Sequence, residues 1–332
     1  MNLKRLSERF EDYYHGRDVV VTGADGFIGS HLVDALLECN ARITIIVRGT
    51  SHNGCGQWNF RCLAHPPERF AAIIPCDIGS PECMEILARI PVGTLFHLAA
   101  IAYVNYSFDH PMEVFRANAT GTLNILEGVR RSSTLQRIVV QSSSEVYGSR
   151  QGDSIAENHP LEPTSPYAAS KLAAEKMALA YHKTYGLPVV VARPFNTYGP
   201  RHLYDVVPKF IDLALANRPL TIYGDGLQDR DFSYVEDTIQ GLLALGSTPG
   251  KEGKTFNLGT GTSTTILELA KEILNQSGSR SIIQHVAPRA AEVSSLRANI
   301  SRAKSELGFA PLVSLAEGLA ANLEWARERK RT

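Results

Sequence analysis

Short apolar runs alternate with helical patterns along the first part of the chain. Residues 19–22 form an apolar run, residues 23–29 are rich in glycine, residues 30–39 have a helical pattern, and residues 43–47 form a second apolar run. This order of strand, glycine turn, helix and strand predicts one βαβ unit of a parallel sheet covered by helices.

The same alternation continues further along the chain. Four more apolar runs predict strands, at residues 72–78, 92–100, 137–141 and 188–192. Two long helical patterns cover residues 111–131 and 167–185. We therefore predict an α/β fold with a Rossmann-type, doubly wound parallel sheet.

The regularity falls after residue 194, where proline and glycine separate shorter elements. We predict an N-terminal extension over residues 1–17, an NAD(P)-binding domain over residues 18–194 and a smaller C-terminal α/β substrate lobe over residues 195–332. The extension is expected to form a short helix laid over the first strand, and the boundary between the lobes is approximate.

Composition excludes several classes of function. The 332 residues are 44% hydrophobic and 20% charged, which is ordinary for a globular protein. Lys and Arg together number 34, as do Asp and Glu, so no net field attracts nucleic acid or an anionic membrane. No apolar run nears the roughly 20 residues that a membrane span needs, and the charged N-terminus does not resemble a signal peptide. The five cysteines, an odd number, favour free thiols and a cytoplasmic protein.

The glycine-rich turn is the first candidate site. Glycine lets a backbone approach the pyrophosphate of a dinucleotide, and the following helix supplies free N–H groups and a partial positive charge. The residues expected to bind a cofactor here are Gly23, Asp25, Gly26, Phe27, Ile28 and Gly29.

Arg48 follows the second predicted strand, where dinucleotide folds often place an acid for the ribose 2′-hydroxyl. An arginine can pair with a 2′-phosphate, so Arg48 favours NADP over NAD. A solvent-facing Arg48 beside NAD stays open as the alternative.

A polar segment further on holds a symmetric set of metal-ligand types. His52 and Cys55 are spaced like Cys62 and His65, and both spacings suit zinc. No other feature of the sequence marks a structural zinc site. We therefore predict no metal and expect this segment to form a loop over the adenosine.

A second cluster carries candidate proton chemistry. Tyr167 and Lys171 are four positions apart at the start of a helical pattern, so both side chains project from one helical face. A nearby ammonium lowers the pKa of a phenol, which would make Tyr167 a usable base near neutrality. Ser143, Ser144 and Glu145 follow the strand at residues 137–141 and add two hydroxyls and a carboxylate.

Tyr–Lys pairs at this spacing are common on helices, so the pair alone is weak evidence of a catalytic site. The other motifs of the chain make the evidence more specific. The sequence reads Thr-Gly-Ala-Asp-Gly-Phe-Ile-Gly-Ser at 22–30, His-Leu-Ala-Ala at 97–100 and Arg-Pro-Phe-Asn-Thr-Tyr-Gly-Pro-Arg at 193–201. Together these motifs resemble the extended short-chain dehydrogenase/reductase family, in particular its sugar-nucleotide epimerases and 4,6-dehydratases. The resemblance covers about residues 17–315. It implies segments that cross between the lobes, and a homodimer joined by a four-helix bundle of the helices at 111–131 and 167–185.

The resemblance also implies roles for single residues. The catalytic residues would be Ser143, Ser144, Glu145, Tyr167 and Lys171. Further contacts to NAD or NADP would come from Asp77, Ile78, Leu98, Ala99, Ala100, Asn118, Tyr167 and Lys171. Contacts to a nucleotide-sugar substrate would come from Tyr103, Ser143, Asn196, Arg201, Tyr223, Arg230 and Arg289.

In enzymes of this kind, Tyr167 would take the proton of a sugar hydroxyl at C4 while hydride passes to a tightly bound, recycled cofactor. Glu145 matches the base that removes the C5 proton in 4,6-dehydratases, so this activity is predicted, with UDP-N-acetylglucosamine and GDP-mannose as candidate substrates. Ser144 departs from the Asp that protonates the leaving hydroxyl in many glucose-type dehydratases. The alternatives are a UDP-glucuronate decarboxylase, a 4-epimerase, and a redox sensor or scaffold that binds a dinucleotide without turnover.

Overall fold

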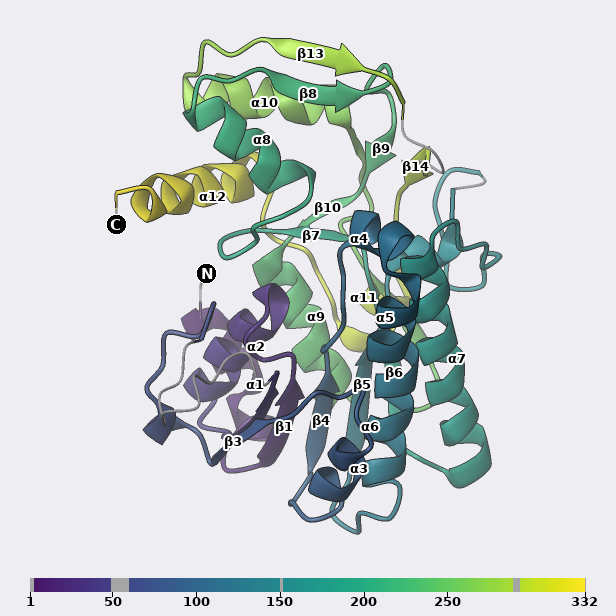
Figure 1. Cartoon of the computed structure of the whole chain (residues 1–332). Coiled ribbons are helices and arrows are strands. Elements are labelled where there is room, and N and C mark those ends of the chain that lie inside the picture. The colour runs from purple at the N-terminus through teal and green to yellow at the C-terminus, as the bar shows by residue number, and fades with distance from the viewer. Residues whose placement is uncertain (1–2, 49–59, 150–151, 289–292, 332) are drawn as a thin grey trace.

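The computed structural model describes residues 3–48, 60–149, 152–288 and 293–331. Figure 1 shows two lobes, a larger one built around a parallel sheet and a smaller one formed mostly by the last third of the chain. No helix in these described ranges is both long enough and apolar enough to cross a membrane.

A seven-stranded, fully parallel sheet forms the centre of the larger lobe. The strand order is β3 (Ala72–Pro75), β2 (Arg42–Val47), β1 (Asp18–Thr22), β4 (Thr94–His97), β5 (Arg137–Gln141), β6 (Val189–Pro194) and β11 (Thr255–Leu258). The order reverses at β1, which pairs with β2 on one side and β4 on the other, and ligands of doubly wound sheets bind at this reversal. The predicted α/β, Rossmann-type sheet is confirmed.

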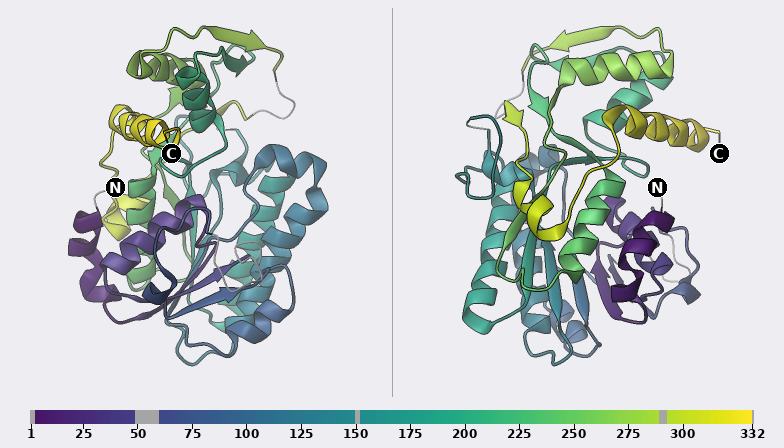
Figure 2. Two further views of the ribbon diagram at one scale, coloured as in Figure 1. Left: turned by 60° about the vertical axis from the view of Figure 1, so that its left-hand side comes forward. Right: turned by 180° about the vertical axis from the view of Figure 1, so that it is seen from behind.

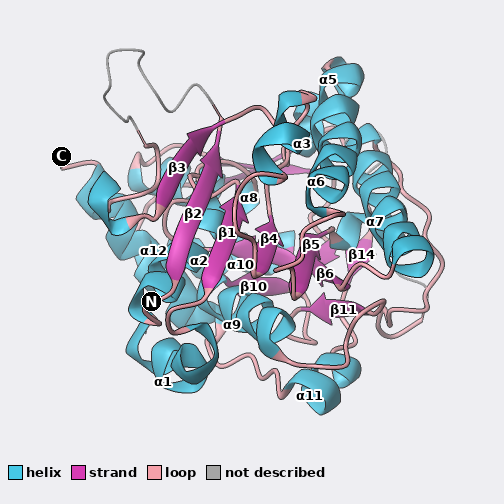
Figure 3. Ribbon diagram, turned by 90° about the horizontal axis from the view of Figure 1, so that it is seen from below, coloured by secondary structure: helices cyan, strands magenta, loops and turns pink. Residues whose placement is uncertain are grey.

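Helices cover both faces of this sheet (Figure 3). On one face lie α2 (Phe27–Glu38) and α9 (Val235–Ser247), and on the other lie α3 (Glu82–Leu87), α6 (Gly121–Val129) and α7 (Pro166–Tyr185). Successive residues of β1 point to opposite faces, so Val19 and Val21 join one hydrophobic core and Val20 joins the other. Two buried faces explain why the strands read as continuous apolar runs.

The N-terminal extension forms the helix α1 (Leu3–Tyr14). It packs against α2 and α9, and its buried residues Leu6, Phe10 and Tyr14 belong to the same hydrophobic core as Val19 and Val21 of the first strand. The Tyr14 hydroxyl donates a 2.7 Å hydrogen bond to the Leu243 carbonyl, which anchors α1 to α9.

The helical pattern at 111–131 is divided in the structure. It begins with α5 (Pro111–Phe115), passes through five residues of π-helix, η3 (Arg116–Thr120), and continues as α6. The short helix α4 (Val104–Asp109) precedes it, and α4 and α5 both pack on α7. Single-turn π-helices are rare and often occur at functional sites.

The smaller lobe is built from short elements that lie above the sheet edge in Figure 1. Its helices are α8 (Val206–Leu215), α10 (Ile266–Ser277) and α12 (Leu315–Arg329). Its strands pair as β8 (Leu220–Tyr223) with β13 (Ile283–Val286), β7 (Asn196–Tyr198) with β10 (Phe232–Tyr234), and β9 (Asp229–Arg230) with β12 (Thr264–Thr265) and β14 (Ser295–Leu296). In the larger lobe, the described residues also include the short 3₁₀-helices η2 (Pro67–Arg69) and η4 (Ser144–Tyr147).

The chain crosses between the lobes more than once. After the smaller lobe has begun, α9 and β11 return to the large sheet, and α11 (Ser301–Leu307) packs against both of them. Figure 2 shows α11 against the larger lobe and α12 in the smaller one. The expected crossing is therefore present, and it adds the seventh strand to the sheet.

A buried ion pair fixes α7 to the sheet. Arg193 at the end of β6 donates a bidentate pair of hydrogen bonds to the Glu175 carboxylate on α7, with Nε 2.9 Å from Oε2. The two side chains are 3% and 0% exposed. Although burial opposes the charged form, the hydrogen bonds that Arg193 donates to Glu175 raise the pKa of Arg193 above its ordinary value.

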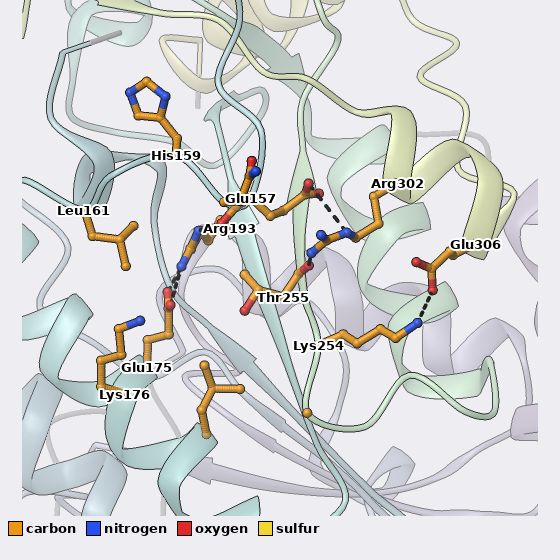
Figure 4. A pocket seen from close by; sticks show the side chains of 13 residues that line it. Glu157, His159, Leu161, Glu175, Lys176, Arg193, Lys254, Thr255, Arg302 and Glu306 are labelled. Carbon is orange, nitrogen blue, oxygen red and sulfur yellow. Dashed lines mark hydrogen bonds and ion pairs between the residues drawn. The ribbon is translucent and has the colours of Figure 1, made fainter. Parts of the chain in front are cut away.

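Figure 4 shows this pair beside a cavity of about 510 Å³ between α7, β11 and α11. The Arg193 guanidinium also donates to the Tyr147 hydroxyl at 2.6 Å, and that hydroxyl donates to Asn257 of β11 at 2.7 Å. Glu157 accepts from the backbone N–H of Asn257 at 3.0 Å. One polar network therefore joins α7, β6, β11 and the end of β5.

Replacing Glu175 with Gln should lower the free energy of unfolding by about 3–5 kcal/mol, because the buried Arg193 loses its counter-charge. Urea denaturation would measure the change. The matched control is Glu306→Gln, which removes the half-exposed carboxylate that pairs with Lys251 and Lys254. An exposed pair of this kind contributes less than about 1 kcal/mol. Equal losses in the two variants would contradict a special role for the Arg193–Glu175 pair.

Candidate functional site

The glycine turn between β1 and α2 forms a close-packed cradle. Gly23 has φ 71°, and a Cβ there would lie 2.7 Å from the backbone nitrogen of Ala99. A Cβ on Gly29 would overlap the carbonyl oxygen of Gly23. Helix α2 begins after Gly26 with no side-chain cap and no acid in its first turn, so its N–H groups and partial positive charge are available to a phosphate. The turn fits the pyrophosphate of a dinucleotide.

Asp25 within this turn faces the segment that follows β2. Its carboxylate accepts hydrogen bonds from the backbone N–H groups of Arg61 at 2.9 Å, Cys62 at 2.8 Å and Leu63 at 3.4 Å. The Asp25 side chain thus holds this segment beside the turn. Its predicted contact with the cofactor has no support from the side-chain geometry.

The predicted zinc-like set is only partly described. Cys62 is buried and bonded through its backbone to Asp25, while His65 Nε2 lies 2.8 Å from Oδ1 of Asp34 on α2. Within the ranges that the structure describes, no group of three or more His, Cys, Asp or Glu residues could hold a metal. His52 and Cys55 lie outside the described residues.

The ends of β2 and β3 lie side by side, because Val47 pairs with Pro75. Arg48 follows β2 and is exposed. Asp77, two residues after β3, accepts from the backbone N–H of Gly79 at 2.9 Å and pairs with Arg116 at 3.0 Å, while Ile78 next to it is buried. These three predicted adenosine contacts lie at the same edge of the sheet.

The turn after β4 contains the small residues that were predicted to pass close to the cofactor. Leu98, Ala99 and Ala100 follow the buried His97, and the Ala99 N–H donates to Thr22 Oγ1 at 3.2 Å. Burial, followed by the charge of Lys171, lowers the pKa of His97 to about 3. His97 is therefore a neutral structural residue.

Asn118 lies in the π-helix and joins three elements. Its Oδ1 accepts from the backbone N–H of Ile101 at 2.8 Å, and its Nδ2 donates to Ser170 Oγ on α7 at 2.9 Å. The side chain is fully buried. Asn118 therefore positions the turn after β4 against the helix that carries Tyr167 and Lys171.

The predicted catalytic residues come together at the end of β5. Ser143 caps η4 by accepting from the Glu145 N–H at 3.2 Å, and its hydroxyl also forms a hydrogen bond with the Tyr167 hydroxyl. Tyr167 lies in the first turn of α7, which Ser165 caps by accepting from the Ala168 N–H at 3.1 Å. The structure thus places Ser143, Glu145 and Tyr167 in one group.

The electrostatics of this group differ from the sequence-based expectation. Burial, followed by the charge of Glu145, raises the pKa of Tyr167 above its ordinary value despite the hydrogen bond from Ser143. Lys171 donates a hydrogen bond to the Gln141 carbonyl, and burial lowers the pKa of Lys171 to about 8. The expected lowering of the Tyr167 pKa is therefore not found in the described chain, where desolvation dominates and Lys171 is not among the main causes of the shift.

A cavity of about 720 Å³ opens between the lobes above this group. The predicted residues that line it are Phe27, Ile28, Tyr103, Ser143, Ser144, Glu145, Tyr167, Asn196, Tyr223 and Arg230. The side-chain oxygen of Asn196 is buried and has no hydrogen-bond partner among the described residues. A molecule in the cavity would supply one.

Arg201, another predicted substrate residue, is not in this lining. Its Nη2 pairs with the buried Asp34 of α2 at 2.8 Å, and its Nη1 has no hydrogen-bond partner among the described residues, so its contact with substrate stays a prediction. Arg289 lies outside the described residues.

The lining also includes residues that sequence reasoning missed. His202, Tyr204 and Asp205 follow the Gly-Pro-Arg motif and reach the cavity through a turn with unusual backbone angles. No local pattern marks them, because the turn depends on contacts with α2 and with Tyr103, whose ring centroid is 5.6 Å from that of Tyr204.

The fold and the cavity define a dinucleotide-binding protein of the doubly wound type, and comparisons with known proteins narrow this class. The family model for GDP-mannose 4,6 dehydratase matches residues 20–321. A dTDP-glucose 4,6-dehydratase of Actinoplanes is 35% identical, with 94% of this chain and 98% of the relative covered. An uncharacterized UDP-glucose epimerase of Bacillus subtilis is 34% identical (91% and 95% covered), as is UDP-glucuronic acid decarboxylase 2 of Arabidopsis thaliana (95% and 69% covered).

Solved structures of sugar-nucleotide dehydratases and epimerases are similar to this chain as well. A dTDP-glucose 4,6-dehydratase of Streptomyces venezuelae, with NAD and TYD bound, superimposes with a TM-score of 0.85 at 32% identity, covering 95% of this chain and 98% of the other. A UDP-glucuronic acid 4-epimerase of Bacillus cereus, in complex with UDP-glucuronic acid and NAD, also gives 0.85 at 31% identity, covering 94% and 99%. The chain belongs to the extended short-chain dehydrogenase/reductase family of NAD-dependent epimerases and dehydratases.

Proposed function

We propose that the protein is an NDP-hexose 4,6-dehydratase, which converts a nucleotide sugar to its 4-keto-6-deoxy product. The observation that carries the proposal is the position of Glu145, a half-buried carboxylate in the cavity beside Ser143 and Tyr167. A 4-epimerase needs no further base once C4 is oxidised, whereas a 4,6-dehydratase must remove the C5 proton. The proposal assigns this step to Glu145.

The reaction assigns a step to each residue. Tyr167 takes the proton of the C4 hydroxyl, with Ser143 holding the same oxygen, and Lys171 holds the nicotinamide ribose. A bound nicotinamide would supply the chemistry of taking up hydride from C4 and giving it back at C6. Glu145 takes the C5 proton, the C6 hydroxyl leaves as water with one added proton, and Tyr167 gives its own proton to C5.

The proton for the leaving hydroxyl comes from Glu145 or from a water molecule. Ser144 is buried and, as a hydroxyl, is a poor acid. The carboxylate of Glu145 gains a proton from C5 and can therefore pass it to the departing oxygen. This makes one residue serve as base and then as acid.

Two other activities stay as candidates because relatives bear their names. A UDP-glucuronate decarboxylase would release CO₂ after the same C4 oxidation, and a 4-epimerase would return hydride to the opposite face of the sugar. All three share the Tyr167–Ser143 geometry and differ in product mass.

Incubation with dTDP-glucose, UDP-N-acetylglucosamine, GDP-mannose and UDP-glucuronate, followed by mass spectrometry, tests the proposal. We expect one neutral sugar to lose one water, and Glu145→Gln to reduce that turnover at least about 100-fold with cofactor binding unchanged, since a base has been removed. Glu162→Gln, an exposed acid nearby, is the control. Loss of CO₂ from the glucuronate, or a new isomer of equal mass, would refute the dehydratase.

We further propose that Arg48 lets the enzyme use NADP, since its exposed guanidinium follows β2 where an acid would otherwise bind the ribose. The solved neighbours carry NAD, so the preference must be measured. Arg48→Ala should weaken NADP about tenfold and leave NAD unchanged, because only NADP has a 2′-phosphate to pair. Fluorescence titration of both dinucleotides would measure this, and an equal effect on both would exclude the role.

We also propose a cytoplasmic homodimer joined through α4, α5 and α7, which lie along one side of the larger lobe (Figure 1). The described cysteines are free thiols, in keeping with a reducing compartment. The side of the lobe carries exposed apolar side chains, at Phe108, Met112, Phe115, Met177 and Tyr185. A second copy would bury this surface in a helical bundle.

Met112 is 80% exposed, so a charge there is harmless to a monomer but is buried uncompensated in the dimer. Met112→Lys combined with Phe115→Lys should halve the mass seen by light scattering. Leu312→Lys, on an exposed apolar residue of the other lobe, is the control. A wild-type monomer, or an unchanged mass in the double variant, would reject this interface.

A further inference from the structure

Asp205 has a backbone conformation that side chains rarely adopt. Its φ is 74° and its ψ is −178°, a region occupied almost only by glycine. It stands at the N-cap of α8, where an aspartate normally accepts from the helix N–H groups, yet its side chain makes no such hydrogen bond. Neither the turn nor the helix explains an aspartate here, and strain of this kind is concentrated at functional sites.

The side chain of Asp205 is held toward the cavity. One carboxylate oxygen, Oδ2, lies 3.2 Å from Nε2 of His202. His202 is buried, and its ring stacks on Phe27 of the glycine turn with centroids 4.5 Å apart and planes 2° apart. The carboxylate itself is 49% exposed, lines the cavity, and receives no hydrogen bond to Oδ1 from any described residue. A ligand in the cavity can therefore reach it.

Asp205 lines the same cavity as Tyr167 and Glu145. Its charge acts on the Tyr167 hydroxyl, as does that of Glu145. Tyr223 and Arg230 line the cavity from the smaller lobe, where Lys209 Nζ is 5.3 Å from the Tyr223 ring centroid. Two carboxylates, Glu145 and Asp205, thus line the cavity together with the cationic side chains of Lys209 and Arg230.

We propose that Asp205 is a specificity-determining residue that accepts hydrogen bonds from hydroxyls of a neutral sugar and repels a sugar with a carboxylate at C6. This inference rests on the proposed sugar-nucleotide function and names the class of sugar that it takes. An ionised carboxylate is an acceptor only, so it suits hydroxyl donors and not another anion. A repulsive group of this kind is a common source of selectivity between similar ligands.

The variant that tests the proposal is Asp205→Gly, because glycine adopts the observed backbone angles without strain. It should fold and have a melting temperature no lower than that of the wild type. Asn217→Gly is the matched control, since Asn217 also has a positive φ, 50°, and lies on an exposed turn outside the cavity lining. Asp205→Asn keeps the size of the side chain and removes only its charge.

Calorimetry would compare three probes in one nucleotide series: the nucleoside diphosphate alone, its neutral glucose or mannose derivative, and the corresponding uronate. UDP, dTDP and GDP are tried first to choose the series. The wild type should bind the neutral sugar at least about tenfold more tightly than the uronate. Asp205→Gly should lose the extra affinity that the neutral sugar adds, and Asp205→Asn should gain affinity for the uronate. Binding of the diphosphate alone should not change, and Asn217→Gly should match the wild type throughout.

Equal binding of neutral sugar and uronate by the wild type, or unchanged selectivity in both Asp205 variants, would overturn the inference while leaving the proposed dehydration to be judged by product mass. Failure of all three diphosphates and their sugars to bind would overturn the proposed function and this inference together.

Discussion

The position of α7 depends on one buried ion pair, that between Glu175 and Arg193. A charge pair in an apolar interior recovers the cost of desolvation only when its geometry is good and its remaining donors are satisfied. Here the guanidinium is held on both edges, by the Glu175 carboxylate and by the Tyr147 hydroxyl. The pair therefore sets the position and rotation of α7 relative to β6, and with it the direction in which Tyr167 and Lys171 project.

One to two turns earlier on the same helix, desolvation outweighs the other effects on the pKa values of Lys171 and Tyr167. Burial raises the pKa of Tyr167 and lowers that of Lys171, so in the described chain both groups move toward their neutral forms. The acids at this end, Glu145 and Asp205, add to the effect on Tyr167. An oxidised nicotinamide would add a positive charge beside the phenol, which lowers a phenol's pKa. In the proposed reaction, the basicity of Tyr167 would therefore depend on occupation of the cofactor site.

Much of this architecture follows from local sequence. Strand β5 was predicted at its observed bounds, and the glycine turn was predicted because strand, turn and helix are adjacent in the chain. The grouping of Ser143, Glu145 and Tyr167 was predicted with the help of the family resemblance, because hydrophobic periodicity alone does not show which elements lie close together in the fold. Their expected electrostatics failed because burial, which decides the pKa of Tyr167, is a property of the folded chain.

The features that were missed all depend on distant contacts. Strand β11 joins the large sheet from beyond residue 250, and the π-helix at Arg116–Thr120 is stabilised where Asn118 meets Ile101 and Ser170. Arg201 sits in a motif that suggested substrate binding, yet it pairs with Asp34, a residue in the middle of an earlier helix. A sequence motif identifies a residue but does not show which other residue of the folded chain pairs with it.

Asp34 also connects the two halves of the site, namely the helix that follows the glycine turn and the loop that carries Arg201 and Asp205. Its carboxylate pairs with Arg201 through one oxygen and His65 through the other, each at 2.8 Å. His31, one turn earlier on α2, bonds the Pro200 carbonyl at 3.0 Å. The helix whose N-terminus faces the pyrophosphate site therefore anchors, through its second and third turns, the loop that carries Asp205. Because hydride transfer requires close contact between sugar and nicotinamide, fixing both binding elements to one helix supplies the positioning that the proposed reaction needs.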